Sequence, residues 1–130
     1  MPYSLSISHS KDIVAVIISR SEGVGIDVEY IHPKVQRVAD KFMSDEEMKH
    51  IPENGDKTKS LILHWSIKET LFKLYAEGEL SFKEQLWVMD VPDGDRGRVN
   101  ACIHTENKLL IPVDYKIMNG EVVLTYSFSG

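Results

Sequence analysis

Two acidic side chains, Asp27 and Glu29, lie two residues apart in a segment that alternates apolar and polar residues. In an extended strand both carboxylates leave the same face, and like charges this close repel unless one is protonated, solvent separates them or a cation lies between them. Mg²⁺ takes oxygen ligands and commonly uses one or two carboxylates together with phosphate and water. An Asp-x-Glu pair alone is a weak motif, so it indicates either half of a magnesium site or the solvated outer face of a hairpin.

A second group of charged residues lies in the longest helical pattern of the chain. Trp65, Glu69 and Lys73 follow one another at four-residue intervals and form one stripe of a helix, with Lys68 on its flank. Glu69 before Lys73 is a favourable order for a helical ion pair, and Trp65 then belongs to the core. Alternatively, Glu69 supplies a third carboxylate and the two lysines bind an anion. Both interpretations stay open at this point.

The third group is the triplet Ser8-His9-Ser10 after the first predicted strand. A histidine between two hydroxyl residues at a strand-to-loop junction can donate hydrogen bonds to phosphate, although a turn histidine is more often solvated. The other histidines lack metal-ligand spacing, and no glycine-rich loop lies between a strand and a helix. The sequence therefore indicates neither a zinc site nor a nucleotide-binding fingerprint.

The sequence pattern around these residues predicts an α+β fold, in which a mostly antiparallel sheet is packed with one long and two shorter helices. Strands are expected at residues 3–7, 13–19 and 24–29, and the β-branched residues of 13–19 indicate a central strand. In the third strand, Val28 is expected to point into the core. From residue 80 onward, turn residues such as Asn119-Gly120 separate the strands of a meander.

Three helices are expected. The first begins at Pro33 and ends near Met43, and the second begins at Ser44. Ser44 and Glu47 fit a capping box, in which each side chain bonds to the backbone N–H of the other residue. The third covers residues 57–76 after a loop at 52–56, and Gly78 closes it.

Composition limits the classes of function. The 130 residues suffice for one domain, expected to span 1–130, and the 20 acidic against 15 basic residues give a net charge of −5 that does not attract nucleic acid. The single Cys102 cannot form an internal disulfide, which favours a reducing compartment. No apolar run reaches the roughly 20 residues of a membrane span, and no signal peptide is evident. We therefore expect a cytoplasmic protein without a membrane or nucleic acid partner.

Four motifs in order give the chain a resemblance to a known family. They are residues 8–10 (SHS), 25–29 (GIDVE), 42–47 (FMSDEE) and 65–69 (WSIKE) followed by Lys73. In this order and spacing the chain resembles the 4′-phosphopantetheinyl transferase superfamily, related to holo-acyl-carrier-protein synthase. It is most similar to the C-terminal half of the surfactin-synthetase-activating type. The resemblance covers most of residues 7–80.

The resemblance implies transfer of the phosphopantetheine arm of coenzyme A to a serine of an acyl or peptidyl carrier protein, leaving adenosine 3′,5′-bisphosphate. It implies Mg²⁺ as cofactor and coenzyme A as co-substrate. The implied roles are those of metal ligands for Asp27, Glu29 and Glu69, of catalytic groups for Glu69 and Lys73, and of coenzyme A ligands for Ser8, His9, Lys68 and Lys73. Glu47 matches an acidic position of the third motif, where helix capping is an equally good explanation.

The sequence contains only the half of the surfactin type that carries the metal motif. It therefore self-associates to rebuild the cleft between halves, pairs with another chain, or is a fragment with weak or no activity. We favour a homo-oligomer, by analogy with the short type of the family. A non-catalytic module that binds coenzyme A or a carrier protein is the alternative function, but all three carboxylates and both lysines are retained, which favours an enzyme.

Overall fold

The structure is a computed structural model that describes residues 3–51, 57–75, 80–88, 91 and 94–129. Its described part is α+β, as predicted, with a five-stranded antiparallel sheet, a two-stranded hairpin and helices. The elements in chain order are β1 (Ser4–Ser10), β2 (Ile13–Ser19), β3 (Gly23–Tyr30), α1 (Val35–Val38), the 3₁₀ turn η1 (Ala39–Lys41), α2 (Asp45–Lys49), α3 (Lys57–Leu74), β4 (Leu86–Val88), β5 (Arg96–His104), β6 (Lys108–Met118) and β7 (Val122–Ser129).

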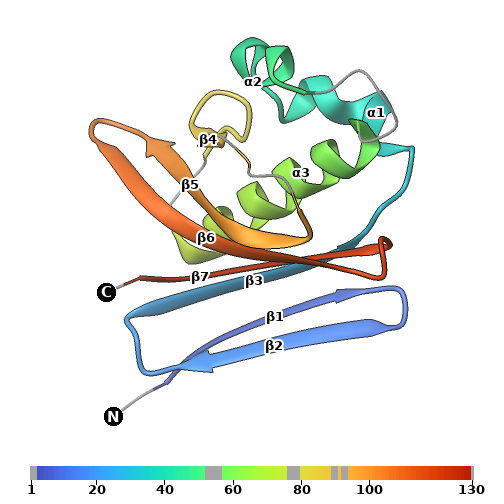
Figure 1. Ribbon diagram of the computed structural model, residues 1–130. Coiled ribbons are helices and arrows are strands. Elements are labelled where there is room, and N and C mark those ends of the chain that lie inside the picture. Colours follow the sequence, from blue (N-terminus) through green and yellow to red (C-terminus); the bar gives the residue numbers. More distant parts are fainter. Residues whose placement is uncertain (1–2, 52–56, 76–79, 89–90, 92–93, 130) are drawn as a thin grey trace.

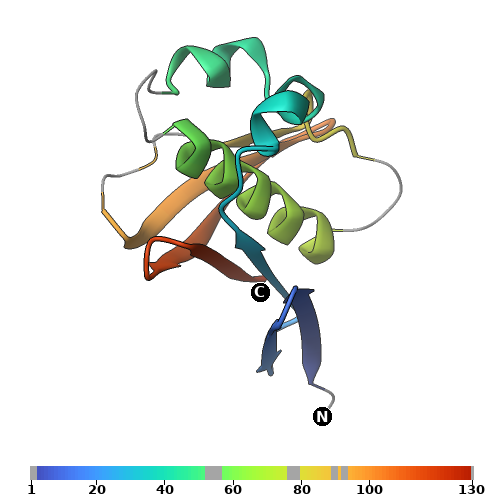
Figure 2. The ribbon, with the colours of Figure 1, turned by 90° about the vertical axis from the view of Figure 1, so that its right-hand side faces the viewer.

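The five-stranded sheet has the order β3-β7-β6-β5-β4, and every neighbouring pair is antiparallel. The meander predicted for the second half of the chain is confirmed. Asn119 and Gly120 both have positive φ, as the tight turn between β6 and β7 requires. Helices α1, α2 and α3 all lie on one side of this sheet, and α3 crosses it directly (Figures 1 and 2). The main core fills the space between α3 and the sheet.

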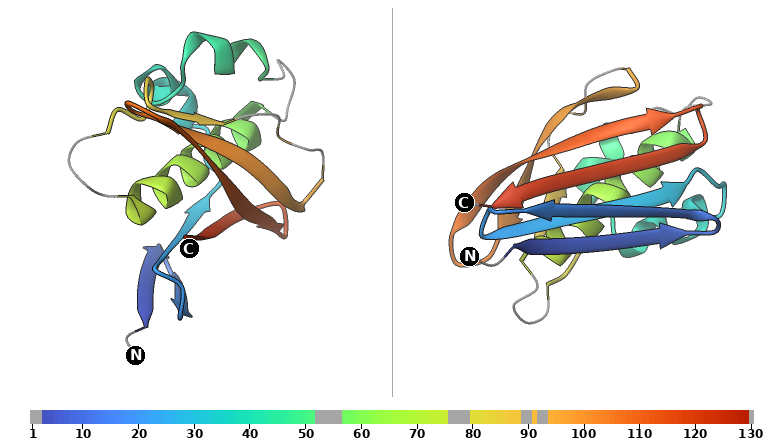
Figure 3. Two further views of the ribbon diagram at one scale, coloured as in Figure 1. Left: turned by 90° about the vertical axis from the view of Figure 1, so that its left-hand side faces the viewer. Right: turned by 90° about the horizontal axis from the view of Figure 1, so that it is seen from below.

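Strands β1 and β2 form a separate hairpin on the side of the sheet opposite α3 (Figure 1). Seen from below, this hairpin follows β3 and leaves β6 uncovered (Figure 3). The prediction that residues 13–19 form a central strand is wrong, because β2 pairs with β1 alone. One face of β2 packs against β3, and the other face is exposed.

Strand β3 is buried on both faces because the hairpin lies on one side of it and α3 on the other. Val24, Ile26 and Val28 are buried but lie outside the main core cluster. Val28 is buried as predicted, at 1% exposure, but on the face of β3 that meets the hairpin and not in the main core cluster. The opposite face of β3, which carries Gly25, Asp27 and Glu29, is the one that meets α3.

The helices before α3 are shorter than the sequence predicts. The helix expected to end near Met43 is α1 followed by the 3₁₀ turn η1, and Phe42 has already left helical geometry. The capping box of α2 is confirmed, with both reciprocal bonds of Ser44 and Glu47 present. The long helix is confirmed as α3 and ends at Leu74, while the predicted loop at 52–56 and the closing Gly78 lie outside the described residues.

Candidate functional site

The site begins with an unusually close approach of α3 to β3. A Cβ atom on Gly25 would lie 2.5 Å from the backbone oxygen of Thr70, so only glycine fits between strand and helix here. Hydroxyl groups also join α3 to β7, the strand next to β3: Thr125 Oγ1 lies 2.7 Å from Thr70 Oγ1 and 2.8 Å from Ser66 Oγ. These positioning residues were missed from the sequence, where a glycine inside a strand was the available signal.

The close approach brings Asp27 and Glu29 of β3 against Glu69 of α3, and we call these three residues the acidic cluster. Asp27 is 3% exposed, and its Oδ1 accepts a hydrogen bond from Ser8 Oγ at 3.4 Å. Its Oδ2 is buried and has no hydrogen-bond partner among the described residues. A buried carboxylate oxygen without a partner is rare and indicates a place where a ligand is expected.

Burial and mutual repulsion raise the pKa of two members of the acidic cluster. Burial is the largest cause of the rise in the pKa of Glu29 to about 8, and the neighbouring charges of Asp27 and Glu69 add to it. A hydrogen bond from Trp65 acts against this rise. Burial also raises the pKa of Glu69, as does the charge of Asp27, whereas Lys73 lowers it. Glu29 therefore keeps its proton near neutral pH, which relieves the repulsion that the sequence implied.

Lys73 lies beside the acidic cluster, where the predicted stripe of α3 places it. Its Nζ is 3.7 Å from Asp27 Oδ1 and donates hydrogen bonds to the backbone oxygens of Ile26 at 2.7 Å and Ile7 at 3.4 Å. Its side chain stays partly exposed. One ammonium group thus joins α3 to β1 and β3 and is also within reach of an incoming anion.

Lys68 does not join this group, and its predicted contact with a ligand phosphate is corrected by the structure. The side chain is 0% exposed, and Nζ donates to Glu47 Oε1 at 2.7 Å, to the Phe82 oxygen at 2.8 Å and to the Phe42 oxygen. These three acceptors use all three donors of the ammonium group. Position 68 lies next to Glu69 along the chain but faces a different side of α3.

Glu47 holds Lys68 in place, and its role is wider than helix capping. Oε1 accepts from the Ser44 N–H at 2.9 Å as well as from Lys68, and Oε2 accepts from the Val88 N–H at 2.9 Å. This side chain therefore ties α2, α3 and β4 together. Trp65 contacts residues on both sides: its ring packs against Phe42 with centroids 5.2 Å apart, and its side chain hydrogen-bonds to Glu29.

The structure separates Ser8 from His9. Strand β1 continues to Ser10, so the triplet lies within a strand and not at its junction with a loop. Ser8 is buried, donates to Asp27 and accepts from the Val28 N–H, whereas His9 is exposed. Because successive residues of a strand face opposite sides, Ser8 belongs to the acidic cluster's surroundings and His9 to the outer face of the hairpin.

The predicted metal ligands are neighbours, but they do not form a complete coordination site. In the part of the chain that is described, no group of three His, Cys, Asp or Glu side chains is placed to hold a metal ion. The three residues nevertheless lie close enough that the charges of Asp27 and Glu69 raise the pKa of Glu29. Metal binding by all three would require their side chains to move.

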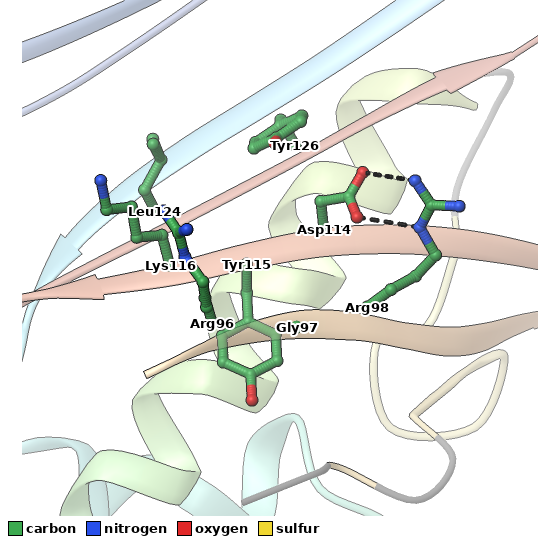
Figure 4. Close-up of a pocket in the computed structure, with 8 residues that line it drawn as sticks. All are labelled: Arg96, Gly97, Arg98, Asp114, Tyr115, Lys116, Leu124 and Tyr126. Atoms are coloured by element: carbon green, nitrogen blue, oxygen red, sulfur yellow. Dashed lines mark hydrogen bonds and ion pairs between the residues drawn. The ribbon is translucent and has the colours of Figure 1, made fainter. Parts of the chain in front are cut away.

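A hollow of about 650 Å³ lies elsewhere, on the sheet face opposite α3. Figure 4 shows Asp114 and Tyr126 pointing to this outer side while Tyr115 points to the other. The lining includes the paired Arg98 and Asp114, with Nε and Oδ1 2.9 Å apart. Since none of the predicted site residues lines it, this hollow is separate from the acidic cluster.

Among the helices that the structure describes, none combines the length and the apolar character needed to span a membrane.

Comparison with known proteins identifies the relationship. A family model described as the 4′-phosphopantetheinyl transferase superfamily matches residues 23–126. The match includes β3, all helices and the remaining strands up to β7, and it excludes the hairpin β1–β2. A search of curated proteins finds no match.

Proposed function

The chain belongs to the 4′-phosphopantetheinyl transferase superfamily, whose members are transferases, and on that premise we propose that it moves the phosphopantetheine arm of coenzyme A to a serine of an acyl or peptidyl carrier protein. The observation that carries the proposal is the buried, unpartnered Oδ2 of Asp27, beside two carboxyl groups and the ammonium of Lys73. A site with both signs of charge suits a cation and a phosphate together. We also propose that the enzyme acts as a homo-oligomer.

The acidic cluster fits Mg²⁺ by its donor set. Asp27 offers a free buried oxygen and Glu69 a second carboxyl group beside it, and Glu29 would give up its proton when a cation binds. Hard cations prefer such oxygen ligands. The chemistry that Mg²⁺ supplies at a site of this kind is to neutralise and polarise a pyrophosphate.

The chain's own residues account for the remaining needs of the reaction. The carrier serine oxygen forms a bond to the phosphorus next to the pantetheine arm, and the bond from that phosphorus to adenosine 3′,5′-bisphosphate breaks. Glu69 takes the serine proton, since burial raises its pKa and so makes it a better base than an exposed carboxylate. Lys73 stabilises the negative charge that grows on the leaving pyrophosphate oxygen. Asp27 orients Lys73 through their ion pair.

The test mixes the chain with coenzyme A, Mg²⁺ and several apo carrier proteins, and follows the carrier mass. We expect the carrier to gain the phosphopantetheine arm, and to gain none when EDTA removes the metal. Asp27→Asn should abolish transfer, and Glu69→Gln should slow it roughly 10²–10⁴-fold if the carboxylate is the base. Asp40→Asn is the matched control, because Asp40 is exposed in the turn η1.

Two outcomes would contradict the proposal. If no carrier gains the arm while coenzyme A still binds, the chain is a binding module and not an enzyme. If Asp27→Asn transfers as fast as Asp40→Asn, the acidic cluster is not the site.

A further inference from the structure

Side chains, and not another strand, satisfy the outer edge of β3. In the part of the chain that is described, β3 pairs with β7 alone, and β1 and β2 form a sheet of their own. The Ile26 N–H donates to Ser6 Oγ at 3.1 Å, and the Ile26 oxygen accepts from Lys73 Nζ at 2.7 Å. The Val28 N–H donates to Ser8 Oγ at 3.1 Å. Since the edge of a sheet presents unpaired backbone groups, these contacts attach the hairpin and α3 to β3.

Ser8 differs from Ser6 in one contact, which reaches the acidic cluster. Its Oγ also donates to Asp27 Oδ1 at 3.4 Å, and among the described residues Ser6 has no such bond to a carboxylate. A hydroxyl group has one proton to donate. Because Ser8 Oγ already accepts from the Val28 N–H, its own proton is directed to Asp27. Ser8 is 6% exposed, so water has little access to this contact.

The bond from Ser8 gives the two oxygens of Asp27 different surroundings. Oδ1 accepts from Ser8 and lies 3.7 Å from Lys73 Nζ. Oδ2 is buried and has no hydrogen-bond partner among the described residues. Without the bond to Ser8, the carboxylate is free to turn toward the ammonium group of Lys73 with both oxygens, and none is then left for a cation.

We propose that Ser8 is a positioning residue of the acidic cluster, which fixes the carboxylate of Asp27 so that Oδ2 stays free for a divalent cation. Groups that hydrogen-bond to a metal ligand orient it, and their loss typically lowers metal affinity about 10–100-fold. This role rests on the proposed function, since it takes the acidic cluster as the cation site. It differs from the role of coenzyme A ligand that the resemblance implies for Ser8, because the one hydroxyl proton is used within the chain.

With this role, the hairpin β1–β2 becomes part of the site. The family model begins at residue 23 and does not include the hairpin. Ser8 lies on β1, and Lys73 Nζ donates to the Ile7 oxygen of the same strand at 3.4 Å. Strand β1 therefore contacts both the carboxylate of Asp27 and the ammonium group beside it.

The test titrates Mg²⁺ alone into the full chain by calorimetry, without coenzyme A or carrier. We expect Ser8→Ala to bind Mg²⁺ about 10–100-fold more weakly than the wild type. Ser6→Ala is the matched control, because Ser6 lies on β1 and accepts from a backbone N–H of β3 but is not bonded to Asp27 in the part of the chain described. Its Mg²⁺ affinity should equal that of the wild type, whereas a purely structural role of the serines would change both variants alike.

Circular dichroism and urea unfolding establish that the variants fold. If Ser8→Ala does not fold, Ser8→Cys takes its place, since a thiol is of similar size but only a weak donor, and Mg²⁺ affinity should again fall. A folded Ser8→Ala or Ser8→Cys with the Mg²⁺ affinity of Ser6→Ala would overturn the inference, as would a wild type that binds no Mg²⁺. Loss of coenzyme A binding in Ser8→Ala at unchanged Mg²⁺ affinity would also overturn it, and would identify Ser8 as a coenzyme A ligand.

The titration separates this inference from the proposed function because it contains neither substrate. A lower Mg²⁺ affinity of Ser8→Ala, together with a wild type that transfers nothing, contradicts only the proposed chemistry. Transfer by the wild type, together with equal Mg²⁺ affinities of Ser8→Ala and Ser6→Ala, contradicts only the role of Ser8.

Discussion

Two acid–lysine contacts lie on different sides of α3, and they differ in how completely their polar atoms are satisfied. On one side Lys68 uses its three donors, and Glu47 accepts from Lys68, Ser44 and Val88. On the other side Asp27 leaves one buried oxygen without a partner, and its ion pair with Lys73 is 3.7 Å long. The surroundings of an acid–lysine contact therefore decide whether its polar atoms are all satisfied.

The number of satisfied polar atoms distinguishes the structural contact from the candidate site. A buried pair with every donor and acceptor matched has no capacity left for a ligand, so it holds elements together. A buried acid with an orphan oxygen and neighbours with raised pKa values retains the capacity to bind a cation. Sequence spacing alone does not separate the two, because Lys68 and Glu69 are adjacent.

The largest effect on stability is expected from the removal of Lys68. Lys68→Met keeps the length of the side chain but leaves Glu47 buried beside two backbone oxygens without their donor. We expect a loss of about 3–5 kcal/mol in the free energy of unfolding, because the remaining charge is uncompensated. Urea denaturation at neutral pH measures it.

Lys73→Met is the matched control for that measurement. Lys73 is partly exposed and its contact with the buried Asp27 is 3.7 Å long, so its loss should cost less than that of Lys68, about 1–2 kcal/mol, while transfer is lost. Equal destabilisation by the two variants would contradict the distinction between a structural and a functional lysine.

The next prediction concerns the distance between α3 and β3, the two elements that carry the acidic cluster. In Gly25→Ala the new methyl group would lie 2.5 Å from the Thr70 backbone oxygen, so strand or helix must shift. We expect a loss of about 1–3 kcal/mol in the free energy of unfolding, as for other overpacked sites. Because the shift separates Asp27 from Glu69, cation binding measured by calorimetry should fall with it.

Gly23→Ala provides the comparison. There the nearest atom is the Ser129 hydroxyl at 2.8 Å, the end of a side chain that can rotate away. If Gly25→Ala were as mild as Gly23→Ala in stability and in cation binding, the close approach would not position the site.

Much of this molecule could be predicted from local pattern. The capping box, the long helix and the Asn119-Gly120 turn each depend on neighbouring residues, and each is confirmed. The burial of β3 on both faces was not predicted, because the hairpin that covers it is placed by contacts such as Ser6 Oγ with the Ile26 N–H, twenty residues away.

The residue types of the candidate site could be predicted from the sequence. Which lysine joins the acidic cluster and which lysine is structural could not. The stripe of Trp65, Glu69 and Lys73 could be read from helical spacing, and the structure brings it to β3. Lys68 could not be assigned in this way, since its three acceptors come from segments 14 to 26 residues away. Tertiary hydrogen bonds of that kind leave no local signal.

The third prediction concerns how the stability of the folded chain depends on pH. The pKa of Glu29 is about 8 in the folded chain, far above its ordinary value of 4.5, so the folded state holds this proton more tightly than the unfolded state. Its contribution to stability is therefore complete below about pH 4.5 and is lost as the pH rises through about 8. Without metal, stability should fall across this window, and Mg²⁺ should restore it most at the alkaline end.

Glu29→Gln isolates this group. The variant cannot ionise, so it should be more stable than the wild type at pH 9 by on the order of 1–2 kcal/mol, a value reduced by solvent screening of a partly exposed group. Thermal unfolding at pH 5 and pH 9, with and without Mg²⁺, measures the effect. An identical pH dependence in both proteins would remove Glu29 as its source.

The variant with the smallest expected effect tests whether the Glu47–Lys68 pair depends on the N-cap of α2. Ser44→Ala removes the hydroxyl that accepts from the Glu47 N–H at 3.2 Å, but it leaves the Ser44 N–H bond to Glu47 Oε1 and the contacts with Lys68 and Val88. We expect a loss of about 0.5–1 kcal/mol in the free energy of unfolding, the usual cost of an N-cap. A loss as large as that of Lys68→Met would mean that the cap positions Glu47 for the whole network. A small loss means that Lys68 and the Val88 N–H fix the carboxylate, so the network is anchored in α3 and β4 and α2 only completes it.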